Sequence, residues 1–109
     1  MNVKVESLAK EAMELKNEAI TRALEKIGLM AEAYAKVEIT NQGAVDTGNL
    51  RNSITHEARE NYVVVGTNVE YAPYVELGTH KMKERPYLKP AIDNHLPQYK
   101  EIIKQALKE

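Results

Sequence analysis

The sequence predicts an α+β domain in which a long N-terminal helix and a C-terminal helix pack with an antiparallel β-sheet that has a central hairpin. Three observations support this fold class. Apolar residues recur at helical spacing over about residues 5–38, β-branched residues gather between Ser53 and Thr67, and a second helical pattern follows Pro90. The length of 109 residues suits a single domain with a modest core.

The N-terminal helix has the clearest pattern. A continuous helix over residues 5–38 would be about 50 Å long, which is more than a small domain needs, so part of it is expected to project or to meet another subunit. The alternative is an amphipathic helix that breaks near Gly28, because glycine is a poor helix former. The predicted apolar stripe, with a step of about 3.6 residues, comprises Leu8, Ala12, Leu15, Ala19, Ala23, Ile27, Met30, Tyr34 and Val37.

Residues 40–79 are predicted to form a loop, a hairpin and a short helical turn. Asp46 or Thr47 is expected to cap a helical turn over residues 49–53, because both residue types are preferred at helix starts. The segment from Ser53 to Thr67 alternates, turns near residues 60–61 and ends in a valine run, as a β-hairpin does. Pro73 and Gly78 then bracket a short helical turn, in the favoured order for these two residue types.

A polar, basic loop and a final helix complete the predicted chain. The loop covers residues 79–89, and the helix covers about residues 90–108, with Pro90 at its start. Pro97 falls inside the helical pattern and is expected to kink or delay the helix. The loop carries His80, Lys81, Lys83, Arg85 and Lys89.

The charges are unevenly distributed along the chain. Residues 80–109 hold seven Lys or Arg against four Asp or Glu, whereas residues 40–79 hold two against five. Opposite patches on one chain suit head-to-tail self-association. The basic loop also supports an alternative function, a nucleic-acid-binding accessory protein that uses residues 80–89, although four Lys or Arg are too few to form a complete footprint on a duplex.

Composition disfavours several other classes of protein. The net charge is -1 and the pI is about 6.3, so there is no general attraction to nucleic acid or to anionic membranes. The absence of cysteine excludes disulfides and zinc–thiolate sites. His56, His80 and His95 lack the spacing of metal ligands, and no phosphate-binding loop is present, so no metal and no cofactor are expected. His56, in a predicted strand, is interpreted as a half-buried structural residue.

The chain also shows no membrane signal, and its aromatic residues are restricted to tyrosine. No apolar run is long enough for a signal peptide or a spanning helix, so no membrane contact is expected. Phe and Trp are absent, and six tyrosines are the only aromatic residues. Since tyrosine has a polar tip, these residues are expected at partly wet surfaces and interfaces rather than in a deep core.

The triplet Asp46-Thr47-Gly48 raises one enzymatic alternative, a homodimeric aspartic protease that uses Asp46. In such proteases two copies of the triplet hold two carboxylates that share a proton. That fold needs a mostly β chain, but two predicted helices take about half of this sequence. Capping is therefore the favoured role, and it predicts that Asp46→Asn preserves stability while Asp46→Ala costs about 0.5 to 2 kcal/mol.

Three sequence blocks, "VDTGNLRNSI", "VGTNVEYAPYVELGT" and "RPYLKPAI", resemble in this order and spacing the gp-ten-like minor tail component family of long-tailed phages and prophages. The resemblance spans about residues 45–94. Leu77 and Tyr87 stand where the family often has Phe, and both keep an apolar side chain. The matching residues are Asp46, Thr47, Gly48, Leu50, Arg51 and Ser53, then Val65, Gly66, Thr67, Tyr71, Ala72, Pro73, Tyr74, Glu76, Gly78 and Thr79, then Pro86, Leu88, Pro90 and Ala91.

The resemblance implies a structural, non-enzymatic virion protein at the head-proximal end of the tail, in tail completion or head-tail joining. The implied partners are further copies of the chain in a ring-like homo-oligomer, and phage neck, connector or tail-tube proteins. Assembly in the bacterial host cytoplasm and residence in the virion follow from this role. The candidate motif and interface residues are Asp46, Thr47, Gly48, Leu50, Arg51, Tyr71, Pro73, Tyr74, Glu76, Gly78, Thr79, Pro86 and Pro90.

Overall fold

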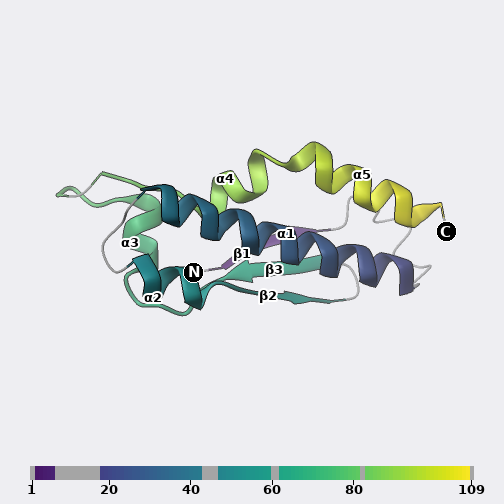
Figure 1. The fold of residues 1–109 in the computed structure, drawn as a ribbon, viewed down its shortest axis with the longest axis horizontal. Coiled ribbons are helices and arrows are strands. Elements are labelled where there is room, and N and C mark those ends of the chain that lie inside the picture. Colours follow the sequence, from purple (N-terminus) through teal and green to yellow (C-terminus); the bar gives the residue numbers. More distant parts are fainter. Residues whose placement is uncertain (1, 7–17, 43–46, 60–61, 82, 109) are drawn as a thin grey trace.

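The fold is α+β, as predicted, and it contains a long helix, an antiparallel hairpin and helices at the C-terminal end (Figure 1). The computed structural model describes residues 2–6, 18–42, 47–59, 62–81 and 83–108. No helix in these ranges is both long enough and apolar enough to cross a membrane. The elements are β1 (Asn2–Glu6), α1 (Glu18–Gln42), α2 (Thr47–Ser53), β2 (Thr55–Ala58), β3 (Tyr62–Gly66), α3 (Ala72–Leu77), α4 (Leu88–Asp93) and α5 (Leu96–Leu107).

Within the described residues, the sheet has three strands in the order β1-β3-β2, and both of its pairs are antiparallel. The β2–β3 pair is the predicted hairpin, and its turn at residues 60–61 lies outside the described residues. The prediction that the long helix starts near residue 5 was wrong, because Val5 belongs to β1 and lies opposite Val63 of β3. The alternating sequence "NVKVE" has the two-residue period of a strand.

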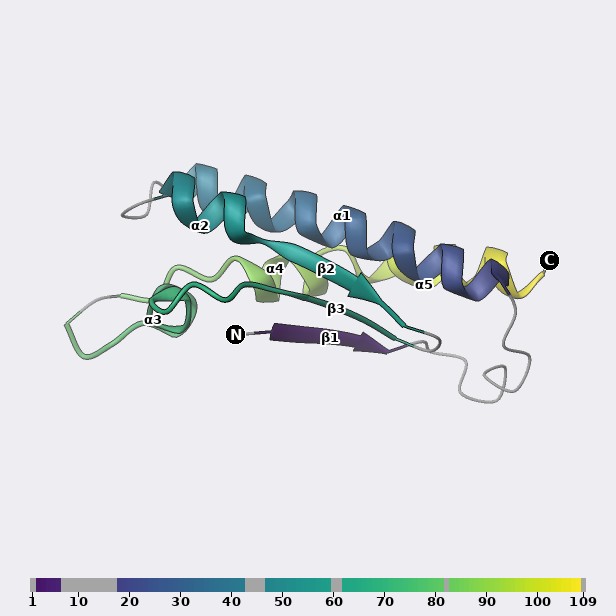
Figure 2. The same ribbon diagram turned by 90° about the horizontal axis from the view of Figure 1, so that it is seen from below.

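The long helix α1 lies across one face of the sheet, and α4 lies beside it over β1 (Figure 2). The helix continues through Gly28, so the predicted alternative of a break there was wrong. Gly28 instead permits close approach to the sheet, because a Cβ atom there would lie 2.8 Å from Cγ2 of Val63.

The buried stripe of α1 differs in part from the predicted one. The stripe follows the prediction through Ile27 and then continues through Ala31, Ala35 and Ile39, all of which are fully or almost fully buried. Val37, a member of the predicted stripe, is 53% exposed. The shift arises because α1 faces the sheet on one side and α4 and α5 on another, so its buried face is wider than a single stripe. Leu8, Ala12 and Leu15 lie outside the described residues.

The predicted C-terminal helix is divided into α4 and α5, with a break at Asn94 and His95. Pro97 lies in the first turn of α5, which confirms that this proline delays the helix. The helical region begins at Leu88, two residues before the expected start at Pro90. Packing on the sheet is found for α4, which contacts β1, whereas α5 packs along α1.

Two tyrosines are buried, contrary to the expectation that tyrosines would occupy partly wet surfaces. Tyr87 is fully buried and Tyr99 is 2% exposed. Each hydroxyl satisfies its polar tip by donating a hydrogen bond to a backbone carbonyl, from Tyr87 to Ala72 at 3.2 Å and from Tyr99 to Ala91 at 2.6 Å. A tyrosine can therefore belong to the core where a backbone carbonyl accepts a hydrogen bond from its hydroxyl.

Candidate functional site

The described residues of the three sequence blocks concentrate at one end of the molecule (Figure 1). This region, named here the α3 end, consists of α2, α3 and residues 78–87 before α4. The molecule is elongated, with extents of 48 × 23 × 22 Å, so the α3 end forms one extremity. Asp46 lies outside the described residues, and α2 begins at the next residue, Thr47.

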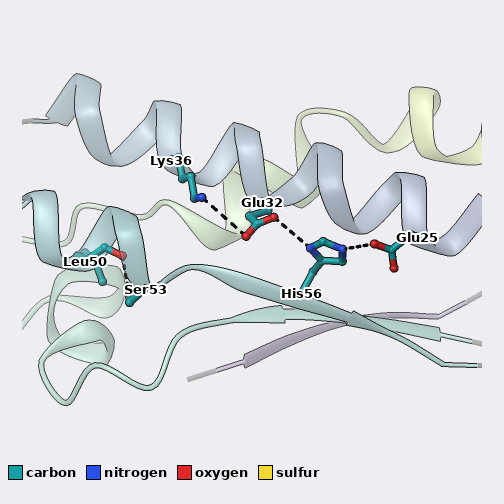
Figure 3. Close-up of polar contacts among 6 residues, drawn as sticks. All are labelled: Glu25, Glu32, Lys36, Leu50, Ser53 and His56. Carbon is teal, nitrogen blue, oxygen red and sulfur yellow. Dashed lines mark hydrogen bonds and ion pairs between the residues drawn. The ribbon is translucent and has the colours of Figure 1, made fainter.

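The short helix α2 is anchored to the rest of the domain by both apolar and polar contacts. Leu50 is fully buried in the core. The Ser53 hydroxyl lies 2.6 Å from the Leu50 carbonyl oxygen (Figure 3) and 2.5 Å from Oγ1 of Thr67, which in turn accepts a hydrogen bond from the backbone of Val69. Arg51 donates to the hydroxyl of Thr40 on α1 at 3.3 Å. Side chains of the first block therefore fix α2 against α1 and against the segment that follows β3.

The helix α3 follows the predicted Pro and Gly pattern. Pro73 lies in its first turn, and Gly78 ends it with a φ of 77°, a left-handed value that favours glycine. The Gly78 amide donates to the Tyr74 carbonyl at 2.8 Å. Tyr71, just before the helix, accepts a hydrogen bond from the Asn49 side chain of α2 at 3.3 Å. These contacts join the first and second blocks.

Glu76 is the central anchor of the α3 end. Its side chain is buried, at 4% exposure, and its carboxylate accepts three backbone hydrogen bonds. Oε1 accepts from Tyr87 at 3.1 Å and from Leu88 at 2.8 Å, and Oε2 accepts from Lys89 at 3.2 Å. These amides open α4, where helix N–H groups have no partner within the helix and a negative charge is favoured. Glu76 thus joins the second block to the third.

Tyr87 is also part of this anchor, because its backbone amide donates to Glu76 and its hydroxyl donates to the Ala72 carbonyl. Burial, together with the nearby charge of Glu76, raises the pKa of its phenol well above the ordinary value. Next to it, the Arg85 amide donates to the Val75 carbonyl at 2.7 Å. The segment after α3 therefore returns to this helix at Arg85. The buried residues Glu76 and Tyr87 stand before and after this segment in the chain.

The outer part of the α3 end presents apolar and basic side chains to solvent. Tyr74 is 57% exposed and Leu77 is 66% exposed. The following loop extends beyond the helices in both ribbon views (Figures 1 and 2). Thr79 accepts a hydrogen bond from the Lys81 backbone at 3.2 Å, and Pro86 is partly buried. The exposed members of the predicted basic loop are His80, Lys81, Lys83, Arg85 and Lys89.

The predicted site residues thus divide into two groups. Leu50, Glu76 and the backbone around Gly78 are internal supports, whereas Tyr74, Thr79 and the basic residues form the surface. Sequence reasoning placed Glu76 among the interface residues and missed its internal role. A carboxylate within the otherwise apolar helix "APYVEL" was the available signal, since buried carboxylates need hydrogen-bond partners.

A second polar cluster lies where α1 crosses β2. His56 of β2 lies between Glu25 and Glu32 of α1 (Figure 3). Its side chain is 12% exposed, in agreement with the predicted half-buried position. Sequence reasoning did not foresee the two carboxylate partners, which stand 31 and 24 residues earlier in the chain.

A groove between α1 and α5 lies outside the three blocks. Its volume is about 750 Å³, and its floor is largely apolar while charged and amide side chains stand along it. It is lined by Ala19, Arg22, Ala23, Lys26, Met30, Pro97, Gln98, Glu101, Ile102, Gln105 and Ala106.

In the part of the chain that the structure describes, no group of three or more His, Cys, Asp or Glu side chains is placed to hold a metal ion. Thr47 and Gly48 belong to helix α2, whereas the protease alternative requires its triplet on a loop fed by a strand. The α3 end presents exposed apolar and basic side chains on a helix held by internal hydrogen bonds.

Fold and surface together define a small α+β domain whose α3 end is ordered and presents apolar and basic side chains. Residues 1–78 match the HK97-gp10-like family model, whose description is "Bacteriophage HK97-gp10, putative tail-component". The match covers more than half of the chain, so the chain belongs to this family of phage tail components, and the resemblance drawn from the sequence blocks is confirmed. Its role is therefore structural, and its place is the virion. Comparison with curated proteins and with solved structures gave no significant match.

Proposed function

We propose that this chain acts at the head-proximal end of a phage tail, in tail completion or head-tail joining. It does so by associating with copies of itself in a closed ring and by docking to neck, connector or tail-tube proteins. Membership of a tail-component family supports the structural role. The exposed apolar pair at the α3 end, next to basic side chains, is the observation that carries the binding function.

The α3 end has the properties of a protein interface. Tyr74 and Leu77 are two of the most exposed large hydrophobic residues in the described chain, and aromatic side chains are enriched in interfaces. The helix that carries them is fixed at both ends, because Tyr87 donates to the Ala72 carbonyl at its start and Glu76, near its end, accepts from the Leu88 amide. Because the surface is already ordered, a partner binds it with a smaller entropy cost than it would meet on a flexible segment.

The elongated shape favours a head-to-tail contact. An extremity that binds a different surface of the next copy makes a heterologous contact, which either closes into a ring or continues as a filament. Ring closure is the form that a tail end requires. The α3 end supplies the basic side of this contact through Lys81, Lys83 and Arg85.

The structure narrows the arguments that the sequence offered for self-association. Tyr87 is buried and is not available for contacts, whereas Tyr71 is partly exposed and Tyr74 is exposed. The negative charge of residues 40–79 is also less available than the sequence count indicated, because Glu76 is buried and Glu57 pairs with Arg59 at 2.7 Å. The proposed contact is therefore mainly apolar, with the basic loop as its charged rim.

Light scattering over a concentration series tests self-association. We expect the apparent mass of the native chain to rise with concentration, and Tyr74→Ser or Leu77→Ser to weaken this rise strongly. Leu29→Ser is the matched control, because Leu29 is 52% exposed but lies on α1, away from the α3 end. Arg85→Glu is expected to weaken association at low salt more than at physiological salt, where the Debye length is about 8 Å.

Electron microscopy of isolated tails or heads mixed with the purified chain tests the place of action. Decoration at one tail end is the expected result, and the Tyr74→Ser variant should decorate less. A chain that remains strictly monomeric at high concentration, and also when tails are present, contradicts the ring. Association that Leu29→Ser weakens as much as Tyr74→Ser does would place the interface elsewhere.

A further inference from the structure

The seam between α1 and β2 contains a second arrangement, independent of the proposed tail function. Here His56 enters the helix–sheet interface beside Gly28, where the helix has no side chain. A Cβ atom at position 28 would lie 2.6 Å from Cδ2 and 2.9 Å from Cγ of the His56 ring. The glycine therefore makes room for the imidazole between the helix and the sheet.

Both nitrogens of this ring face a carboxylate. Nδ1 lies 3.0 Å from Oε2 of Glu32, and Nε2 lies 2.6 Å from Oε1 of Glu25 (Figure 3). An ionised carboxylate only accepts hydrogen bonds, and a neutral imidazole has only one N–H. Only the imidazolium can therefore donate to both carboxylates, whereas the neutral ring turns one lone pair towards an oxygen.

We propose that His56 is a protonation-controlled clamp, which fastens α1 to β2 through two carboxylates when the ring is charged and releases one of them when it is neutral. The two carboxylates are not equivalent. Glu32 is 18% exposed and also lies 3.7 Å from the Lys36 ammonium, whereas Glu25 is 51% exposed. Glu25 is the carboxylate released, because water can replace its partner at the smaller cost.

Among the described residues, the charged partners of the His56 ring are Glu25 and Glu32. From α1 the facing charged groups are Glu25, Glu32 and Lys36. The neighbouring strand β3 contributes Val63 and Val65, which do not titrate. On β2 itself, Glu57 points to the opposite face of the sheet, as adjacent strand residues do.

The electrostatic balance at His56 agrees with the clamp. Burial alone lowers the pKa of the ring, but hydrogen bonds and charge from Glu25 and Glu32 outweigh it and raise the pKa above the ordinary value of 6.5. A histidine with a raised folded-state pKa contributes stability that is fully present below 6.5 and is lost as the pH rises through the folded-state value. The clamp is therefore closed in mildly acidic solution and opens towards alkaline pH.

Nitrogen-detected NMR of the histidine rings in the full-length chain tests the charge state. We expect His56 to titrate at a pH above the ordinary histidine value of 6.5. Glu25→Gln should lower the His56 midpoint, because Gln offers no charge. The matched control is Glu101→Gln, which removes a carboxylate on α5 that pairs with Gln105 and should leave the midpoint unchanged.

Hydrogen exchange tests the mechanical part of the proposal. After correction for the intrinsic pH dependence, the protection of the amides of residues 55–58 should fall severalfold as the pH crosses the His56 midpoint, while amides in α5 do not change. Glu25→Gln should reduce this pH response. A His56 midpoint at or below 6.5 overturns the charged clamp, and constant protection across the midpoint overturns its release.

Discussion

Two carboxylate sites, one formed by Glu76 and the other by Glu25 and Glu32, hold elements of this fold together by different chemistry. Glu76 is buried and accepts hydrogen bonds from three backbone amides, none of which titrates near neutral pH. Glu25 and Glu32 bind a histidine, whose charge depends on pH. The contacts of Glu76 join neighbouring segments at the α3 end, while those of His56 join α1 to the sheet.

The two sites differ in whether their hydrogen-bond donors depend on pH. Backbone amides keep their protons throughout the range in which histidine titrates, so Glu76 keeps its donors there. A carboxylate held by a histidine loses its donor within the range where histidine titrates. The protein thus combines an α3 end held by donors that do not titrate near neutral pH with a helix–sheet seam that responds to protons, and the following substitutions test this contrast.

Removing the fixed anchor should have the largest effect. Glu76→Ala leaves the amides of Tyr87, Leu88 and Lys89 without their acceptor and empties a buried position, so we expect a loss of about 3 kcal/mol in the free energy of unfolding. Denaturant unfolding measures it, with the exposed Glu70→Ala as control. Glu76→Gln should lose less, about 1 kcal/mol, because one oxygen remains to accept.

The fixed anchor predicts a loss that changes little with pH. If the destabilisation by Glu76→Ala decreased steeply between mildly acidic and mildly alkaline solution, the contrast with His56 would fail.

Filling the space at Gly28 should disturb the seam without changing a charge. Gly28→Ala places a methyl group within 2.6 to 2.9 Å of His56 and Val63, so we expect a net loss of about 2 kcal/mol despite the better helix propensity of alanine. Gly48→Ala is the matched control, because a Cβ atom there has no neighbour within 4 Å. It should be neutral or slightly stabilising. Equal effects of the two substitutions would show that close approach at Gly28 is unimportant.

Removing a hydrogen bond between neutral groups should have an intermediate effect on stability. Its pH dependence should appear in alkaline solution. Tyr99→Phe removes the donor to the Ala91 carbonyl and should cost about 1 kcal/mol at neutral pH. Burial and the neighbouring Tyr34 raise the pKa of Tyr99 from 10.0 to about 12. The folded state therefore prefers the neutral phenol, and stability is lost as the pH rises above 10.0.

Unfolding measured at increasing alkaline pH checks this sign. Tyr99→Phe should lose stability less steeply than the native chain above pH 10, whereas the exposed Tyr74→Phe should follow the native curve. Parallel curves for all three chains would contradict the buried, neutral phenol.

The smallest effect is expected at the rim of the site formed by Glu25 and Glu32. Lys36→Gln removes a partly exposed partner of Glu32, so the change in stability should be less than about 0.5 kcal/mol. Because the Glu32 charge is then less compensated, the pKa of His56 should move further upward. Histidine NMR measures the direction, and Lys100→Gln on α5 is the control. A downward movement would show that Lys36 supports the clamp rather than competing for Glu32.

Features encoded by adjacent residues were predictable from the sequence. The hairpin follows from alternation and its valine run, α3 from Pro73 and Gly78, and the interruption before α5 from Pro97. The strand β1 was missed because its five alternating residues precede a much longer stretch with a helical period. The exposure of Val37 could not be foreseen, since it depends on where α4 and α5 lie against α1.

The candidate site divides in the same way. The three blocks located the α3 end and its exposed residues, and they indicated the family. The internal role of Glu76 depends on amides 11 to 13 residues later in the chain, and the environment of His56 depends on carboxylates 24 and 31 residues earlier. Such partners are set by tertiary packing, which residue spacing alone does not reveal.

The pairing of the first strand with β3 has a consequence for biosynthesis. Asn2 lies opposite Gly66 and Glu6 opposite Tyr62, so β1 cannot join its ladder until the ribosome has synthesised β3. During that interval α1 can already form, because its hydrogen bonds are local, whereas the edge of β1 has no partner from its own sheet. The order of synthesis therefore makes sheet closure a late folding step, and the nascent chain is most exposed to intermolecular strand pairing before β3 emerges.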